Sequence, residues 1–586
     1  MSITGPLGKP PLGTFPLGKP PLGKSPLGKP PLGKPPLGKV SLGTSPLGTA
    51  SLSTASLGAG HSGRRRFLQT GAAVLAAPNI ARAQGKSVLK FVPAADLSVL
   101  DPVWTTSYQS RDHGFLVFDT LYGLDSQFRP HPQMVEGAVT DDGGKTWRLT
   151  LREGLLFHDG TKVLARDAAA SIRRWGARDG FGQALLAATD EIGAPDDRTI
   201  LFRLKAPFPL LPDALAKTPP SMCPIMPERL ALTDPFKQVT EMVGSGPYRY
   251  KADERVPGAL VVYERNTAYR PRGDGVPDGT AGPKVAHFER IEWRIIPDAA
   301  TVSAALRRGE VDWWLTPDAD LLPSLRTQAG VRVENTVPTG FIATMRFNHL
   351  VPPFDNPALR RAVYGAVTQS DYMIGMVGTD PANWRDKVGY FCPGTPMANA
   401  VGMEALTGPR DPDKVKRALA EAGYKGETVV VLTPTDIASA RALAEITADT
   451  LRKAGMNVEA PTMEWASLVQ RRVKTDPVSQ GGWNIFHTSW AALDMVTPAG
   501  HVFLRGNGKA AAPGWPNSPR IEALRDAWFI APDDAARYRI AQELQRQAFE
   551  DVPYIPLGQY FVPTAHRADL TGIIHGNPVF WNVRRT

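Results

Sequence analysis

The strongest chemical signal in this chain is a group of aromatic side chains followed by one carboxylate. Trp465, Trp483, Phe486 and Trp490 lie close together in the sequence, and Asp494 follows. Tryptophan is ordinarily buried, so core packing is the better interpretation for the two residues of the GGWNIF strand pattern. The others remain candidates for a binding site, because aromatic walls with few polar anchors are typical of small-ligand sites.

Local patterns that could indicate catalysis fail on spacing or context. Gly143-Gly144-Lys145-Thr146 looks like a phosphate-binding loop, but the first glycine of GxxxxGK[ST] would fall on Val139, and a strand pattern follows. Ser87-Val88-Leu89-Lys90 fits SxxK but lies in a strand pattern, where serine and lysine cannot stack as on a helix. The histidines show no HExxH or clustered Cys/His spacing, among them His158, His487 and His501. We predict no catalytic residue, no metal site and no cofactor, and no motif supports nickel or haem.

The formal net charge of +10 comes from the first 83 residues. This leader contains ten lysines and arginines and no acidic residue, which leaves 57 basic against 57 acidic residues in the rest. A neutral body gives no electrostatic case for a nucleic-acid partner.

Residues 1–60 are dominated by a PLGKP-type repeat that begins at Pro6 and drifts to SLGTS and SLSTA. So much proline and glycine leaves little apolar side chain to bury, which predicts a disordered segment. A proline-rich ligand for a partner is one alternative. A tandem DNA repeat translated upstream of the true start is another, although no methionine occurs between Met1 and Met134.

Residues 61–83 read as an export signal. Arg64-Arg65-Arg66-Phe67-Leu68 resembles the twin-arginine motif, a weakly apolar stretch follows, and Ala81-Arg82-Ala83 offers a signal-peptidase site. A basic patch before an ordinary helix would explain the charge but not the cleavage box. We therefore expect export by the Tat translocase and cleavage near Ala83.

The exported part is long enough for two or three domains, and no other segment is apolar for long enough to cross a membrane. Cys223 and Cys392 are the only cysteines. They could pair in an oxidising periplasm, but two buried free thiols are the better interpretation.

Periodicity places the elements that would position a site. Strand patterns cover Ser87–Pro93 and a hairpin within Asp142–Gly160, and the latter alternates apolar Trp147, Leu149 and Leu151 with polar residues. Beyond residue 297, helices and strands alternate, and Asn356-Pro357 and Asp411-Pro412 are predicted as helix starts. Thr428–Leu432, Ile437–Ala454 and Asn457–Ala460 predict a βαβ unit with parallel strands.

Four stretches resemble landmarks of one family, in its order. They are KTWRLTLREGLLFHDG from Lys145, GSGPY from Gly244, NHLVPPFDNPALRRAVYGAV from Asn348 and DPDKVKRALAEAGY from Asp411. Each motif alone is weak evidence for the family, but four motifs in the family's order are strong evidence. The chain is similar to extracytoplasmic solute-binding proteins of the peptide/nickel class, family 5, which deliver ligands to ABC importers.

The resemblance implies an α/β fold with two lobes, of the class II, cluster C-like periplasmic binding-protein type, that starts and finishes in lobe one. On this basis we expect lobe one at residues 84–297, with an extra subdomain at about 126–240. Lobe two would cover 298–555, and 556–586 would return to lobe one.

The resemblance also implies the ligand-binding residues. Peptide-binding relatives follow a tryptophan at the position of Trp490 with an aspartate that pairs with the ligand's amino group; Asp494 comes four residues later, where three is usual. His487 stands where oligopeptide binders can place an arginine for a carboxylate. Leu121-Tyr122-Gly123-Leu124 lacks the glutamate common in relatives. The remaining candidates are Trp465 and the loop residues Thr105, Thr106, Ser107 and Tyr108.

These features predict a periplasmic, monomeric binding protein that closes two lobes on a small peptide or organic cationic solute and delivers it to an ABC permease. An exported cofactor-carrying enzyme is the alternative, because the twin-arginine route often carries such proteins. A ligand sensor without transport would use the same fold.

Overall fold

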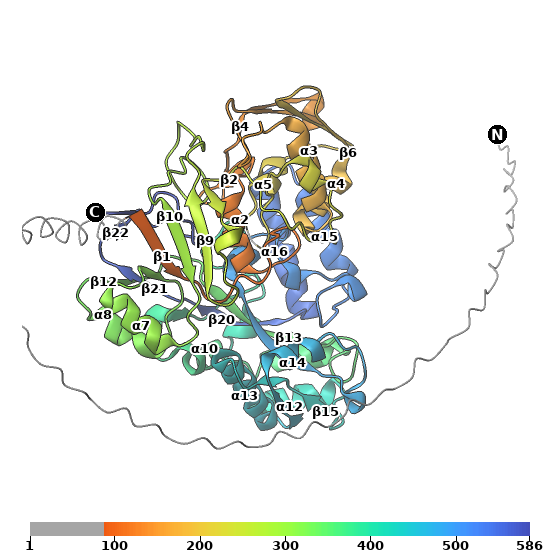
Figure 1. The fold of residues 1–586 in the computed structure, drawn as a ribbon. Coiled ribbons are helices and arrows are strands. Elements are labelled where there is room, and N and C mark those ends of the chain that lie inside the picture. Colours follow the sequence, from red (N-terminus) through yellow and green to blue (C-terminus); the bar gives the residue numbers. More distant parts are fainter. Residues whose placement is uncertain (1–86, 219) are drawn as a thin grey trace, which may run out of the picture. The chain divides into compact units, whose positions relative to one another are not determined.

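A seven-stranded mixed sheet is the framework of lobe one in the computed structural model, which describes residues 87–218 and 220–586 (Figure 1). The central strand β1 runs parallel to β10 and β11, and the other pairings are antiparallel. Leu89 and Phe91 of β1 are buried, as the predicted strand at 87–93 requires. Across the sheet the strands are β12 (Val331–Glu334), β21 (Thr564–Arg567), β11 (Trp313–Trp314), β1 (Val88–Val92), β10 (Arg290–Arg294), β9 (Leu260–Arg265) and β8 (Tyr248–Tyr250). The predictions for residues 1–83 lie outside the described residues.

Lobe two is built on a four-stranded sheet. Its strands, in order, are β14 (Trp384–Arg385), β20 (Ile555–Tyr560), β13 (Phe341–Phe347) and β19 (Ile485–Ala491). All pairings are antiparallel. Beside it, β15 (Thr428–Val430) and β17 (Asn457–Glu459) pair in parallel across α13 (Ala438–Lys453), which confirms the predicted βαβ unit.

Helices surround the second sheet, and their starts follow the predicted caps. Asn356 accepts a hydrogen bond from the Ala358 N–H, and Asp411 accepts from the N–H groups of residues 413 and 414. These side chains satisfy N–H groups that have no partner within the helix. The helices are α9 (Pro357–Tyr364), α10 (Gln369–Val377), α11 (Glu404–Thr407), α12 (Pro412–Glu421), α14 (Trp465–Arg471), α15 (Pro519–Phe529) and α16 (Asp534–Asp551).

A separate antiparallel sheet lies within residues 126–240. Its strands are β4 (Val135–Asp141), β5 (Thr146–Leu151), β7 (Thr199–Leu204) and β6 (Thr189–Gly193), accompanied by α3 (Ala165–Gly176) and α4 (Gly180–Ala188). The alternation in β5 is confirmed, with Leu149 and Leu151 buried. The predicted hairpin is wrong in its second half, because β5 pairs with β4 and β7 instead of the segment at 155–157.

The lobe boundaries differ from those we expected at residues 298 and 556. Strands β11 and β12 hydrogen-bond to lobe-one strands, together with α7 (Ala299–Arg308) and α8 (Leu322–Arg326), so lobe two begins after Glu334. Strand β20 pairs with β13, so the chain returns to lobe one only at β21. Strand β20 therefore belongs to lobe two. Pairing partners decide lobe membership, and periodicity does not reveal them.

A buried ion pair fixes the loop after β1 to the extra subdomain. Arg174 of α3 donates to Asp101 from both Nη atoms, at 3.2 and 2.6 Å. Their side chains are 1% and 0% exposed. Asp101 also accepts the N–H groups of Val103 and Val239. This carboxylate therefore joins the loop that carries four predicted site residues to two segments of the subdomain.

We expect Asp101→Ala to lower the free energy of unfolding by about 3–5 kcal/mol, because it leaves the Arg174 guanidinium buried without a counter-charge. Urea unfolding of purified protein measures the loss. As the matched control, Glu445→Ala breaks an exposed i,i+4 pair with Arg441 and should leave the midpoint unchanged. Equal midpoints for both variants would contradict the structural role of the buried pair.

Candidate functional site

The two lobes meet at Tyr108, the first residue of α2 (Tyr108–Val117). Its hydroxyl donates to Asp494 Oδ2 at 2.8 Å and accepts from the Ala491 N–H at 3.0 Å. Burial, and then the charge of Asp494, raise the pKa of Tyr108 well above its usual range, so the hydroxyl stays protonated. Two residues predicted for opposite walls are thus in direct contact, although the partner of Tyr108 is the carboxylate and not the Trp490 ring.

Asp494 lies in the short 3₁₀ turn η6 (Ala492–Met495) and is only 2% exposed. Oδ1 has no hydrogen-bond partner among the described residues. Burial raises the pKa of this carboxyl to about 6, against the lowering effects of the Tyr108 hydrogen bond and of the charges on Lys217 and Arg111. A buried acceptor without a partner is costly, so this oxygen is poised to accept a hydrogen bond from a cationic donor.

Trp490 lies half-buried near the end of β19. Its ring packs edge-on against Phe503, with centroids 5.0 Å apart, and its Nε1 has no partner among the described residues. The Arg346 guanidinium lies over the other ring of this pair, 4.4 Å from the Phe503 centroid. The indole is therefore held in place by packing from behind.

Arg346 of β13 organises the loop that contains Phe503, the residue packed against Trp490. Burial lowers its pKa to about 9, and its nitrogens donate to four backbone carbonyls. The four acceptors are the carbonyls of Phe503, Ala512, Pro513 and Pro553. The loop backbone around residues 503–513 is therefore fixed by one side chain.

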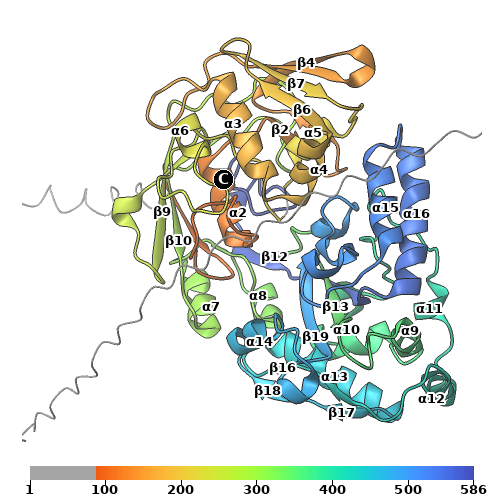
Figure 2. The ribbon, with the colours of Figure 1, turned by 90° about the vertical axis from the view of Figure 1, so that its right-hand side faces the viewer.

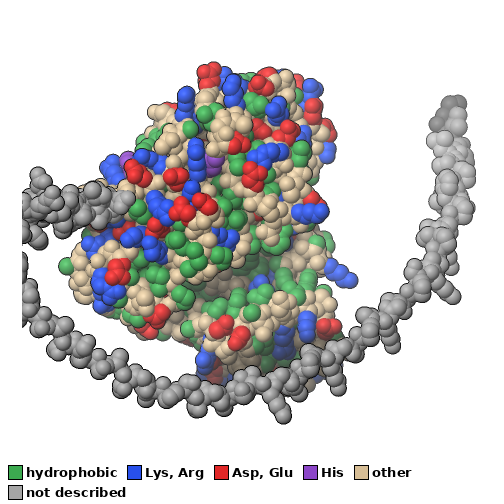
Figure 3. Space-filling model, viewed as in Figure 1, with side chains coloured by type: hydrophobic (Ala, Val, Ile, Leu, Met, Phe, Trp, Pro, Cys, Tyr) green, Lys and Arg blue, Asp and Glu red, His purple; other side chains and the backbone are tan. Residues whose placement is uncertain are grey.

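Thr105 and Thr106 line a cavity of about 180 Å³ between the lobes. Its other walls come from the start of α4, from Lys217, Pro220 and Ser221, and from lobe-two residues between 499 and 512. Ser107 instead bonds Gln109, at 2.9 Å from Oγ to Oε1. Figure 3 shows the surface hollowed between the lobes, with hydrophobic side chains gathered on the walls.

His487 does not join this group. It is 1% exposed, and its Nε2 shares a hydrogen bond with Thr447 Oγ1 of α13 at 2.8 Å. Burial lowers its pKa to about 3, so the ring is neutral and cannot replace an arginine. The physical reason is strand alternation, since His487 and Trp490 are three residues apart and face opposite sides of β19. The sequence itself shows this three-residue spacing, which places the two side chains on opposite faces of a strand.

Trp465 stands apart from the Tyr108–Asp494 contact. It opens α14, is partly exposed, and lies 6.0 Å from the Arg472 guanidinium. No contact between its ring and the other predicted site residues occurs among the described residues. Sequence reasoning did not predict four basic residues that line the inter-lobe cavity, because they come from separate segments of the chain and share no motif. They are Arg178, Lys217, Arg505 and Arg525.

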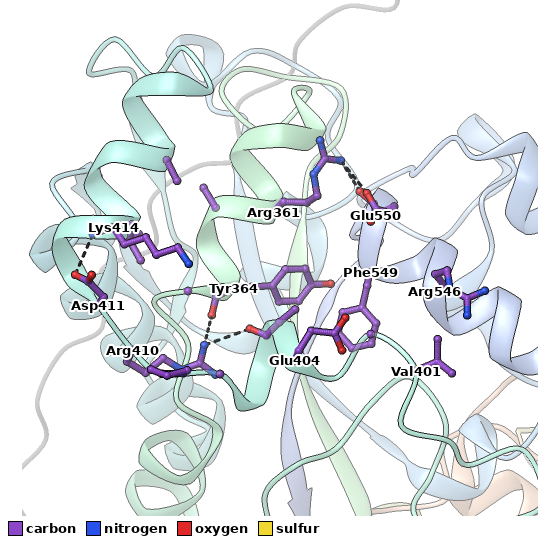
Figure 4. Close-up of a pocket in the computed structure, with 18 residues that line it drawn as sticks. Arg361, Tyr364, Val401, Glu404, Arg410, Asp411, Lys414, Arg546, Phe549 and Glu550 are labelled. Atoms are coloured by element: carbon purple, nitrogen blue, oxygen red, sulfur yellow. Dashed lines mark hydrogen bonds and ion pairs between the residues drawn. The ribbon is translucent and has the colours of Figure 1, made fainter.

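A separate cavity of about 660 Å³ lies entirely on lobe two (Figure 4). Its walls come from α9, α11, α12 and α16, and include Arg361, Arg410 and Phe549. No predicted site residue lines it. A ligand there would touch one lobe only and could not couple binding to closure.

Within the described chain, no helix is both long and apolar enough to span a membrane. The same residues contain no group of three or more histidine, cysteine or acidic side chains that could hold a metal ion. Cys223 and Cys392 are buried free thiols, as expected.

Residues 129–510 match the family described as bacterial extracellular solute-binding proteins, family 5 Middle. The chain belongs to this family. It is 38% identical to the probable peptide ABC transporter periplasmic-binding protein y4tO of Sinorhizobium fredii, over 88% of this chain and 98% of the relative. It is 24% identical to the glutathione-binding protein GsiB of Pectobacterium atrosepticum, over 81% and 88%. Membership makes the chain an extracytoplasmic solute-binding protein and not an enzyme, as predicted.

The solved structure of periplasmic binding protein DppA from Helicobacter pylori, in complex with peptide STSA, has the same fold. The TM-score is 0.68 at 20% identity, over 86% of this chain and 99% of DppA. The predicted two-lobed α/β fold is thereby confirmed.

We expect Tyr108→Phe to shift the ligand-free protein toward a more open form, because it deletes both hydrogen bonds between α2 and the end of β19 and keeps the ring. Two such bonds contribute roughly 1 kcal/mol each. Small-angle scattering should show a larger radius of gyration than wild type.

Tyr424→Phe is the matched control, since its hydroxyl bonds only within lobe two, to the Glu427 carbonyl and the Asn457 N–H. Its radius of gyration should equal that of wild type. A Tyr108→Phe protein as compact as this control would show that the contact does not hold the lobes together.

Proposed function

We propose that this protein is the periplasmic, substrate-binding component of an ABC importer, that it closes its lobes on a small peptide or an organic cationic solute, and that it presents the closed form to the permease. The observation that carries the proposal is the unpaired, buried Oδ1 of Asp494 at the contact between lobes. The similarity to a named peptide-transporter component supports the same solute class.

In this mechanism each predicted residue has a distinct part. Asp494 accepts a hydrogen bond from the ligand's cationic group through Oδ1, and Tyr108 holds the other oxygen. Trp490 supplies an apolar wall for the remainder of the ligand. Thr105 and Thr106 offer hydroxyls from lobe one, in the cavity between lobes. Closure then removes the ligand from water, which strengthens the charge pairing.

Export completes the proposal. The twin-arginine pattern at residues 64–68 and the small-residue box at 81–83 support passage through the Tat translocase, with a mature N-terminus near Gln84. A monomer suffices, because both walls of the site come from one chain.

Asp494→Asn should weaken binding of the natural solute by about 2–5 kcal/mol, because the ligand cation would be buried without its counter-charge. The solute is first identified by native mass spectrometry of protein purified without dialysis, and its affinity is then measured by calorimetry. Asp371→Asn, an exposed carboxylate of α10, is the control and should bind as wild type. Equal affinities for both variants would remove the role of Asp494.

Trp490→Ala should weaken binding of the same solute by about 2 kcal/mol or more, as loss of an aromatic anchor does. If the indole served only as core, the substitution would instead cost about 3–5 kcal/mol of stability in the ligand-free protein. Urea unfolding beside calorimetry separates the two. A loss of stability with unchanged affinity would show that Trp490 is a core residue and not a ligand contact.

Replacing Arg64 and Arg65 by lysine should stop export, because the Tat route reads the arginine pair. Cell fractionation measures the periplasmic share, and N-terminal sequencing of the wild-type protein should begin near Gln84. Replacing Lys9 and Lys19 by arginine preserves the leader's charge outside the motif and serves as the control. Undiminished export of the lysine-pair variant would exclude this route.

A further inference from the structure

The inter-lobe cavity of about 180 Å³ is strongly basic. We call it the basic chamber, defined by the cations Arg178, Lys217, Arg505 and Arg525 that line it. The first two come from the extra subdomain, and the last two from lobe two. Figure 2 shows the two sides of this junction, α4 beside α15. Ring contacts agree, because Phe529 of α15 packs against Phe181 of α4 with centroids 5.5 Å apart.

Two carboxylates serve these four cations. Lys217 pairs with Asp179, and Arg505 pairs with Glu522 at 2.8 Å. The surplus is therefore two positive charges, or one if the neighbouring Asp494 is ionised. The surplus lies with Arg178, which has no ion pair among the described residues, and with Arg525, which shares Glu522 with Arg505.

Arg178 has no ion pair with any described carboxylate. Its Nη2 donates to the Trp104 carbonyl at 2.9 Å, and its guanidinium lies 4.9 Å from the Phe236 ring centroid. These contacts orient the side chain without neutralising it. A guanidinium left in this state suits bidentate recognition of a carboxylate or phosphate.

Arg525 is only partly compensated, because it shares Glu522 with Arg505, and it is only 3% exposed. Its Nε and Nη2 donate to the Pro498 carbonyl at 3.1 and 3.0 Å, while Glu522 lies at 3.6 Å. Burial and the neighbouring charge of Arg505 lower its pKa to about 10, so it stays charged at neutral pH. An anion in the chamber would relieve the repulsion between these arginines.

The end of α4 adds to the same field. Gly180, its first residue, lines the chamber, so the positive end of the helix dipole lies there. Asp179 caps this end and also pairs with Lys217, so its single charge is shared.

The chamber lies beside Asp494, the residue of the proposed cation site, and the charge of Lys217 in the chamber acts on the Asp494 carboxyl. A Cβ placed on Gly500 would lie 3.3 Å from the Asp494 carbonyl oxygen and 4.0 Å from Lys217 Cε. His487, the residue expected to face a ligand carboxylate, is buried against α13 and unavailable. Any anionic part of the ligand must therefore be recognised elsewhere.

We propose that the basic chamber binds an anionic group of the solute, a carboxylate or a phosphate, beside the cationic group held by Asp494. This inference rests on the proposed function, since the chamber is complete only when both lobes contribute. It narrows the solute to molecules that carry both charges.

The test titrates inorganic phosphate, and separately succinate, into purified protein by calorimetry at fixed ionic strength. Wild type should bind at least one of them saturably, with one site per chain. Arg178→Gln should weaken that binding about tenfold or more, and Arg178→Lys should weaken it less, because the charge remains. Binding of phosphate but not succinate would identify the anionic group as a phosphate, and binding of succinate but not phosphate would identify it as a carboxylate.

Arg361→Gln is the matched control, because this arginine lines the separate cavity of lobe two (Figure 4) and should leave anion binding unchanged. Wild type that saturates with neither anion would overturn the inference, as would Arg178→Gln that binds like wild type. Small-angle scattering with the co-purified solute tests the proposed function separately from the anion site. Compaction with no anion binding would leave the proposed function standing, whereas no compaction would count against the proposed function itself.

Discussion

Closure of the two lobes is limited by one carboxylate. When α2 meets the end of β19, Asp494 loses its water, and the Tyr108 hydroxyl replaces only part of it. The raised pKa, about 6, means that the closed empty form favours the protonated acid. Its stability relative to a hydrated form is therefore present at low pH and declines as the pH rises through 6. In the proposed function, a ligand cation at neutral pH would replace the hydration that the Asp494 carboxylate has lost.

The segments around this carboxylate are held in place by two buried arginines. On one side Arg174 and Asp101 tie the loop after β1 to the subdomain. On the other, Arg346 gathers carbonyls of the 503–513 loop and packs on Phe503, which supports Trp490. Both arginines are buried, so their removal would leave unsatisfied partners. Fixing the walls in this way reduces the side-chain ordering that ligand binding would otherwise cost.

The sequence predicted local structure and chemistry better than long-range placement. Caps at Asn356 and Asp411, the βαβ unit and the alternation in β5 depend on neighbours within a few residues, and the structure contains them. Strand partners separated by long stretches of chain were not predictable from periodicity, so β12 and β20 were assigned to the wrong lobes. Tyr108 and Asp494, singled out by resemblance, do meet. The arginines of the basic chamber come from three segments with no shared motif, and only the folded chain brings them together.

The lobe junction contains two groups of opposite charge that lack full partners, Asp494 and the basic chamber. Their opposite charges explain how the ligand-free protein could differ in conformation from the ligand-bound protein. Without ligand, closure buries an acceptor at Asp494 and brings cations of both lobes together in the basic chamber. Each effect opposes closure, since neither charge finds a full partner within the protein. A ligand with only a cation would relieve one of them, and a ligand with only an anion the other. A solute that carries both would stabilise the closed form the most, because a ligand shifts a conformational equilibrium only by its difference in affinity for the two states. Selectivity for the solute and the signal that the site is occupied would then have the same electrostatic origin.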